Sequence, residues 1–120
     1  KANITNSSNF VIRNIVGPKN PKILSSSPTN GETGVDKDFV NIIITFDSTM
    51  DEATLLNNID IIPYFSNEKT LSNDGKTLVI DPTESLTANT QYQILINTKA
   101  LSADEIPLAE DFDLKFTTGL

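Results

Sequence analysis

Residues 40–52, VNIIITFDSTMDE, decide the fold, because a strand pattern in this stretch is followed directly by the start of a helix. Apolar side chains occupy every second position of its first half: Val40, Ile42, Ile44 and Phe46. Successive side chains of a strand point to opposite faces of a sheet. The alternation therefore predicts a strand over residues 40–47 with one buried face.

Residues 49–52, TMDE, have the form of a capping box. In this motif the hydroxyl of Thr49 and the carboxylate of Glu52 would satisfy the first free backbone amides of a helix. The leucines at residues 55–56 give the next turn an apolar face, and the asparagines at residues 57–58 end it. One helical turn between two strands predicts a crossover from one sheet of a sandwich to the other.

The chain after Pro21 continues as short strand patterns separated by turn signals about every 8–12 residues. Pro63 places its strand at a sheet edge or at a bulge. About seven strands, with one short helix after the second strand, predict an all-β, immunoglobulin-like β-sandwich. The further strands are expected over residues 22–27, 59–65, 69–72, 76–81, 91–98 and 112–117, with residues 29–34 as a loop and residues 73–75 as a hairpin turn.

The alternating positions of these strands predict one core between two sheets. A slip of one residue would carry the whole apolar set of a strand into water, so the pattern specifies the register. The predicted core residues are Val40, Ile42, Ile44, Phe46, Leu78, Ile80, Tyr92, Ile94, Ile96, Leu114 and Phe116.

Residues 1–20 form a polar lead around an apolar run at residues 10–12 that continues at residues 15–16. The GPKNP cluster at residues 17–21 then punctuates the chain, since each proline biases its predecessor toward an extended conformation. Two interpretations stay open. Residues 1–20 are either an extra edge strand of the same domain or a strand and linker from a preceding domain, and residues 21–120 are the domain proper.

Composition excludes several classes of protein. The 120 residues include no His and no Cys, which excludes Ser-His-Asp and Cys-His nucleophiles, zinc fingers and disulfides. The net charge of −7 argues against binding to nucleic acid or to an anionic membrane surface. The apolar runs are far shorter than the roughly 20 residues of a membrane-spanning helix. We therefore predict no catalytic residue, no cofactor, no enzyme activity and no membrane insertion.

The composition does not exclude calcium binding, because calcium takes about six to eight oxygen ligands and needs neither His nor Cys. In a sandwich of this kind, the loop after the second strand and the loop before the last strand emerge at the same end. The calcium candidates there are Asp47, Asp51, Asp104 and Glu105. A solvated acidic end that keeps the module soluble explains the same residues, and no EF-hand loop is present.

Several separated motifs stand in an order and spacing that are hard to obtain by chance. They are SPTNG at residues 27–31, ITFDSTMD at residues 44–51, DGKTL at residues 74–78, LTANTQY at residues 86–92 and FTTG at residues 116–119. Through them, residues 20–120 resemble the bacterial Ig-like domains of cell-surface, S-layer and adhesin-type proteins. The resemblance implies a type of module rather than an activity, because this fold hosts many functions. Members usually have an Asp followed shortly by Gly-Asn before the last strand, whereas residues 103–108, ADEIPL, contain no glycine.

Tyr92 begins a strand after a corner that contains proline and leucine. We expect its hydroxyl to bond to a backbone group a few residues upstream, as in the tyrosine corner of Ig-like sandwiches.

We expect such a module to lie outside the cell or on a bacterial cell surface, and three functions are possible for it. The first is a non-catalytic structural spacer in a larger exported protein, with neighbouring domains of the same chain as partners. The second is adhesion, with a surface glycan or a protein as ligand, for which Tyr64-Phe65 is the one candidate exposed pair. The third is an accessory domain of a secreted enzyme.

Overall fold

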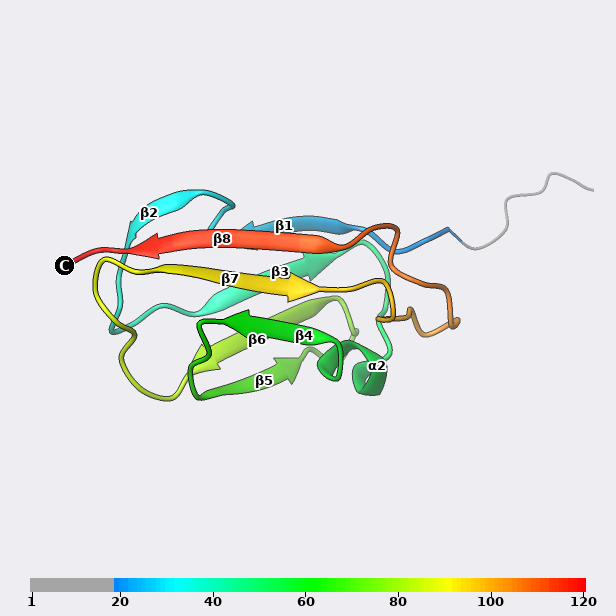
Figure 1. The fold of residues 1–120 in the computed structure, drawn as a ribbon. Coiled ribbons are helices and arrows are strands. Elements are labelled where there is room, and N and C mark those ends of the chain that lie inside the picture. The colour runs from blue at the N-terminus through cyan, green and yellow to red at the C-terminus, as the bar shows by residue number, and fades with distance from the viewer. Residues whose placement is uncertain (1–18) are drawn as a thin grey trace, which may run out of the picture.

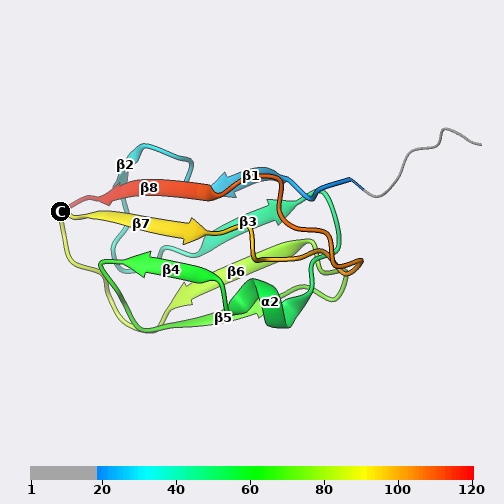
Figure 2. The same ribbon diagram turned by 45° about the vertical axis from the view of Figure 1, so that its right-hand side comes forward.

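The computed structural model describes residues 19–120. Nearly all of the polar lead lies outside this range, so both interpretations of it, and the boundary after residue 20, stay predictions. Figure 1 and Figure 2 show the order of the elements from two sides. The elements are β1 (Ile23–Ser27), β2 (Glu32–Val35), β3 (Ile42–Phe46), α2 (Glu52–Leu56), β4 (Ile59–Ile62), β5 (Asn67–Leu71), β6 (Thr77–Pro82), β7 (Gln91–Ile96) and β8 (Phe112–Thr118). Within residues 19–120, no helix has the length and apolar character needed to cross a membrane.

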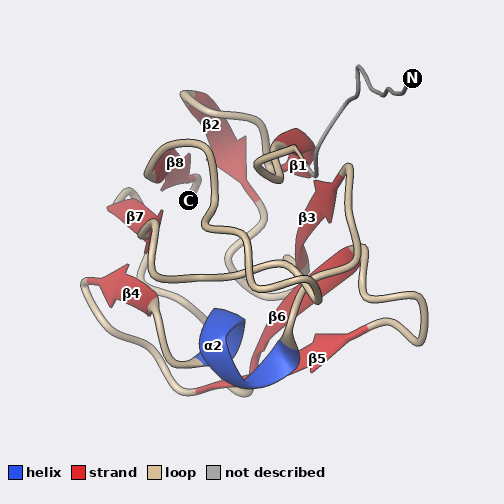
Figure 3. Cartoon of the chain, turned by 90° about the vertical axis from the view of Figure 1, so that its right-hand side faces the viewer, coloured by secondary structure: helices blue, strands red, loops and turns tan. Residues whose placement is uncertain are grey.

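The strands form two four-stranded sheets, ordered β1-β3-β6-β5 and β2-β8-β7-β4. Seen along the strands, the sheets stand as two layers (Figure 3). The buried apolar side chains of both sheets form one core cluster. Every pairing is antiparallel except that of β2 with β8, which is parallel. The predicted all-β, Ig-like sandwich is confirmed. Pro63 follows the last residue of β4, an edge strand, as predicted.

The structure differs from the expectation at residues 29–34, where the prediction of a loop is wrong for the second half of the segment. Only Val35 is buried in β2, so the sequence of this strand has no alternation that could reveal it. Its pairing with β8 makes it a strand. The amide of Gly31 donates to the carbonyl of Lys115 at 2.6 Å, and the amide of Gly119 donates to the carbonyl of Val35 at 2.9 Å.

The predicted core is confirmed at every position but one. Val40 is half-buried, because β3 begins at Ile42 and Val40 packs against the core from the preceding loop. Ile42 pairs with Ile80 and Ile44 pairs with Leu78, so the two strands bury the same face. Segments outside the strands and the helix add apolar side chains that strand periodicity does not reveal, and these are Met50, Phe65, Leu86, Ala100 and Leu108.

Helix α2 carries the chain from β3 in one sheet to β4 in the other, which confirms the predicted crossover (Figure 2). The helix follows the third strand and not the second as predicted, because β2 forms where a loop was expected. Its cap is not the predicted one. Asp51 is the N-cap, and its Oδ2 accepts a hydrogen bond from the amide of Thr54 at 3.0 Å. The hydroxyl of Thr49 has another partner, because its Oγ1 donates to the carbonyl of Asp74 at 2.9 Å. Thr49 therefore ties the crossover to the β5–β6 turn.

That turn requires glycine at position 75. Gly75 has a φ of +71°, and its carbonyl accepts from the amide of Met50 at 2.8 Å. A Cβ at this position would lie 2.6 Å from Cγ2 of Thr49 and 3.2 Å from the nitrogen of Met50. Any side chain would therefore strain the backbone and push the turn away from the crossover.

Phe46→Ala should lower the free energy of unfolding by about 3–5 kcal/mol, because truncating a buried ring leaves a cavity between the sheets. The control is Ile43→Ala in the same strand, whose side chain faces outward and is 38% exposed. The control should cost about 1 kcal/mol or less. Urea unfolding measures both, and a loss under about 1 kcal/mol for Phe46→Ala would contradict the predicted role of this ring.

Candidate functional site

The loops gather at the two opposite ends of the sandwich (Figure 1). We call one end the N-terminal pole, because residues 19–22 lie there with α2, the β5–β6 turn and the β7–β8 loop. The other end is the C-terminal pole, where Leu120 lies near the β4–β5 and β6–β7 loops. The acidic candidates belong to the N-terminal pole.

Asp47 joins the first strand to the third. Its Oδ1 accepts from the amide of Lys22 and from the hydroxyl of Ser48, each at 2.9 Å. In return, the amide of Asp47 donates to the carbonyl of Lys22 at 2.9 Å. The backbone hydrogen bond from Lys22 lowers the pKa of this carboxyl below its ordinary value. The carboxylate is thus engaged in holding the beginning of β1 against the end of β3.

The remaining calcium candidates do not converge on it. The two acidic loops do lie side by side, since the amide of Asp51 donates to the carbonyl of Leu101 at 2.9 Å. The carboxylate of Asp51 caps α2, while Asp104 and Glu105 are exposed on the β7–β8 loop. Among residues 19–120, no group of three or more acidic side chains is placed to hold a metal ion.

The β7–β8 loop, whose sequence lacks the glycine of the family pattern, is organised by Ser102. The buried Oγ of this residue accepts from the amides of Asp104 and Ile106, each at 3.2 Å. Glu105 adopts a φ of +67°, a region that favours glycine. The loop therefore takes a left-handed turn without glycine, and hydrogen bonds to Ser102 hold it.

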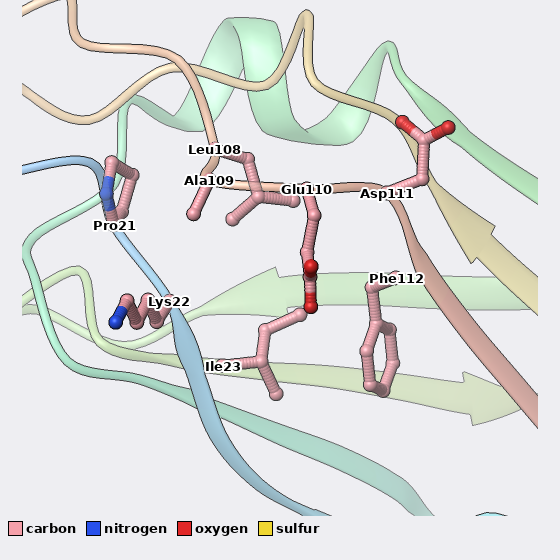
Figure 4. Close-up of a pocket in the computed structure, with 8 residues that line it drawn as sticks. All are labelled: Pro21, Lys22, Ile23, Leu108, Ala109, Glu110, Asp111 and Phe112. Atoms are coloured by element: carbon pink, nitrogen blue, oxygen red, sulfur yellow. The ribbon is translucent and has the colours of Figure 1, made fainter.

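A cleft of about 300 Å³ opens at the N-terminal pole, between the beginning of β1 and the segment that leads into β8. Figure 4 shows Ile23 and Phe112 beside it, with Glu110 extended toward the cleft and Asp111 turned away. Asp111 is engaged elsewhere, because its Oδ1 accepts from the amide of Thr98 at 3.1 Å. A single carboxylate over an apolar cleft lacks the facing second carboxylate that acid–base hydrolysis of a glycoside needs.

A polar groove of about 330 Å³ lies at the C-terminal pole between the β4–β5 and β6–β7 loops. Tyr64 lines it and is 73% exposed, whereas Phe65 is buried and packs edge-on against Tyr92 with ring centroids 5.6 Å apart. The predicted exposed pair therefore supplies one exposed ring. Phe39 in the β2–β3 loop is 82% exposed, and it is not among the residues predicted from the sequence to be exposed. Its position between charged turn residues and a strand is the only sequence signal for this exposure.

The tyrosine corner is confirmed. The hydroxyl of Tyr92 accepts a hydrogen bond from the amide of Thr87, five residues upstream, at 2.9 Å. The ring also stacks on Phe116 with centroids 5.7 Å apart. Tyr92 is 3% exposed, so it supports the β6–β7 loop from inside.

Four aspartates have a pKa below the ordinary value of 3.8, and in each case a hydrogen bond to the charged carboxylate is the main cause. Besides the amide of Lys22 on Asp47, the leading donors are Ser85 for Asp38, Ser72 for Asp74 and Gln93 for Asp113. The bonds on Asp38, Asp47 and Asp113 join loops or neighbouring strands, and the bond on Asp74 lies within the β5–β6 turn. Their role is structural.

The sequence family described as "Bacterial Ig-like domain" matches residues 18–118. No curated protein matches the chain. The surface layer protein SbsC, domains 1–6, is 17% identical with a TM-score of 0.58, and the match covers 84% of this chain and 14% of SbsC. The LD transpeptidase LdtMt1 is 18% identical with a TM-score of 0.58, and the match covers 82% of this chain and 40% of the transpeptidase. PcoC, a methionine-rich copper resistance protein from Escherichia coli, is 18% identical with a TM-score of 0.58, over 83% of this chain and 99% of PcoC.

These likenesses concern the fold alone. The chain spans about one-seventh of the SbsC structure that it matches and less than half of the transpeptidase. PcoC is described as methionine-rich, whereas this chain has one methionine, Met50, and its side chain is 3% exposed.

Calcium should leave the melting temperature unchanged beyond the effect of matched sodium chloride, because the carboxylates of Asp47 and Asp51 already accept backbone amides. A true site would stabilise the fold by about 2.7 kcal/mol at 100 times its dissociation constant. Thermal melting in EDTA, calcium chloride and sodium chloride distinguishes the two cases. A rise seen only with calcium would contradict this prediction.

Acid should destabilise the domain through the four aspartates. A carboxyl whose folded pKa is lowered stabilises the folded state above its unfolded pKa of about 3.9, and this stabilisation is lost as pH falls through the folded pKa. The melting temperature should therefore fall below about pH 4, and Asp47→Asn should make this fall shallower. Melting curves between pH 6 and pH 2 measure both effects. An equal slope in the variant would exclude the Lys22 hydrogen bond as a source of the pH dependence.

Proposed function

Because the chain belongs to the bacterial Ig-like domain family, we propose that it is a non-catalytic structural module that spaces other parts of a larger bacterial cell-surface or secreted protein. One observation carries the proposal: residues 19–22 and Leu120 lie at opposite poles of the sandwich (Figure 1). Because the two ends are separated by the length of the sandwich, the domain places the parts that it connects at least that far apart. A fold whose chain ends are adjacent does not separate the connected parts in this way.

The N-terminal pole supports this role with a fixed attachment. The side-chain amide of Asn20 donates to the carbonyl of Pro107 at 2.9 Å, and the amide of Ala109 donates to the carbonyl of Pro21 at 2.9 Å. Pro21 is itself fully buried. The chain therefore joins the sandwich at a defined angle, which a spacer needs if it is to set a direction as well as a distance.

The net charge of −7 and the likeness to S-layer domains favour a place outside the cell. Like charges on successive modules repel one another, which keeps an array soluble and opposes sideways stacking. The polar lead at residues 1–20 would then serve as the connection to a preceding module, and neighbouring modules of the same chain would be its partners.

The test is the length of tandem chains. Chains that contain one, two and three copies of the 120-residue sequence should show a maximum dimension in small-angle X-ray scattering that rises by a constant step with each copy. Copies that fold back on one another would give a smaller step from the second copy on. Such a result would overturn the spacer proposal.

Adhesion is the second candidate, and the exposed ring of Tyr64 beside the polar groove favours it. An aromatic face next to hydroxyls and a carboxylate suits a glycan, which stacks on the ring and bonds to the polar groups. Glycan-array binding that is lost in Tyr64→Ala and kept in Phe39→Ala would support it. An accessory role in a secreted enzyme is the third candidate, and the likeness to part of LdtMt1 supports that role.

A further inference from the structure

The first and last strands of the sandwich run in the same direction along its long axis. β1 begins at the N-terminal pole, and β8 ends at the C-terminal pole (Figure 1). β1 pairs antiparallel with β3 in one sheet, and β2, the next strand of the chain, pairs parallel with β8 in the other. A pull on the two ends of the chain therefore acts along these strands.

The direction of the pull decides how the strand pairs resist. Hydrogen bonds between strands lie across the strand direction, or are slanted to it in a parallel pair. A strand that is drawn along its own axis loads all of its bonds together, whereas a strand drawn sideways loses them one after another. Forced unfolding is governed by the rate of crossing the unfolding barrier, so loading the bonds together raises the force required.

Both strand pairs, β1–β3 and β2–β8, have additional hydrogen bonds at the end where the pulling force would first act. At the beginning of β1, Lys22 and Asp47 exchange two hydrogen bonds of 2.9 Å, one from each amide. At the beginning of β2, Lys115 in β8 accepts from the amide of Gly31 at 2.6 Å, and its own amide donates to Oδ1 of Asn30 at 2.9 Å. These contacts close the ends of the two strand pairs at which separation would start.

We propose that this module bears mechanical force, and that the β1–β3 and β2–β8 pairs act as two clamps loaded in shear when the chain is stretched between its ends. The inference rests on the proposed spacer function, because a spacer on a cell surface transmits any pull on the parts that it connects. β4, β5 and α2 lie outside the path of the load.

The first experiment compares two pulling directions by single-molecule force spectroscopy on tandem copies of the full chain. One direction pulls between the N- and C-termini. The other pulls between cysteines introduced as Ser66→Cys and Thr83→Cys, in a chain that has no cysteine of its own. The amide of Thr83 donates to the carbonyl of Ser66 at 2.9 Å, so this direction peels the β5–β6 pair apart from its open end. The unfolding force should be clearly higher between the termini. An equal or lower force there would overturn the proposal.

The second experiment compares two aspartates that have the same local chemistry. Asp47 accepts the amide of Lys22 and the hydroxyl of Ser48, and Asp74 accepts the amide of Lys76 and a serine hydroxyl in the β5–β6 turn. Asp47→Ala should lower the unfolding force between the termini, whereas Asp74→Ala should leave it unchanged although both variants lose similar bonds. Equal effects of the two substitutions would refute a clamp at β1–β3.

Asn30→Ala tests the β2–β8 clamp, and it remains available as a test if Asp47→Ala does not fold. It removes the acceptor for the amide of Lys115 and should also lower the force between the termini. A normal force in this variant would exclude a clamp at β2–β8. The tandem-length measurement is independent of these results, so a spacer that unfolds at low force would refute the mechanical role and leave the spacer function intact.

Discussion

The position of β3 between β1 and β6 is the constraint from which the rest of the structure follows. Its inward side chains, Ile42, Ile44 and Phe46, are almost completely removed from water, and a shift of one residue would expose all three. Burial therefore specifies how β3 pairs with β6, and how the end of β3 meets the beginning of β1 through Asp47. Helix α2 then carries the chain to the other sheet, where β4 pairs with β7.

Sequence periodicity predicts the parts of this fold in which one face of a strand is buried. It finds β3, β6, β7 and β8 with their core residues, and the Tyr92 corner follows from the same pattern. It misses β2, whose conformation depends on the distant β8, and it assigns the helix cap to Thr49, where Asp51 is found. The two failures differ in range: β2 is held by residues more than 80 positions away, and Thr49 is drawn to the carbonyl of Asp74, whereas the bond from the amide of Thr54 to Asp51 is local. Local pattern carries no information about the long-range bonds of β2 and Thr49, and it does not by itself decide between two possible caps.

The acidic residues show the same limit for the candidate site. Their types and spacing suit calcium, yet the carboxylate of Asp47 joins two strands and that of Asp51 caps a helix. Sequence places the two acidic loops at one pole correctly, since backbone hydrogen bonds join them. It cannot tell which carboxylates are already engaged, because that depends on the backbone amides that face them. Two of the four candidate carboxylates, those of Asp47 and Asp51, thus have a structural role, and those of Asp104 and Glu105 are exposed.

The parallel pairing of β2 with β8 also bears on how the chain becomes folded. Residues 32–35 find their partner more than 80 residues later, in the last strand of the domain. The pairing is thus of high contact order, and such pairings form slowly. A chain that is being synthesised cannot complete either the β2-β8-β7-β4 sheet or the core beneath it until the residues of β8 are available. Until β8 is available, the apolar faces of the earlier strands lack one of the strands that cover them in the native state, and such exposed strands favour aggregation.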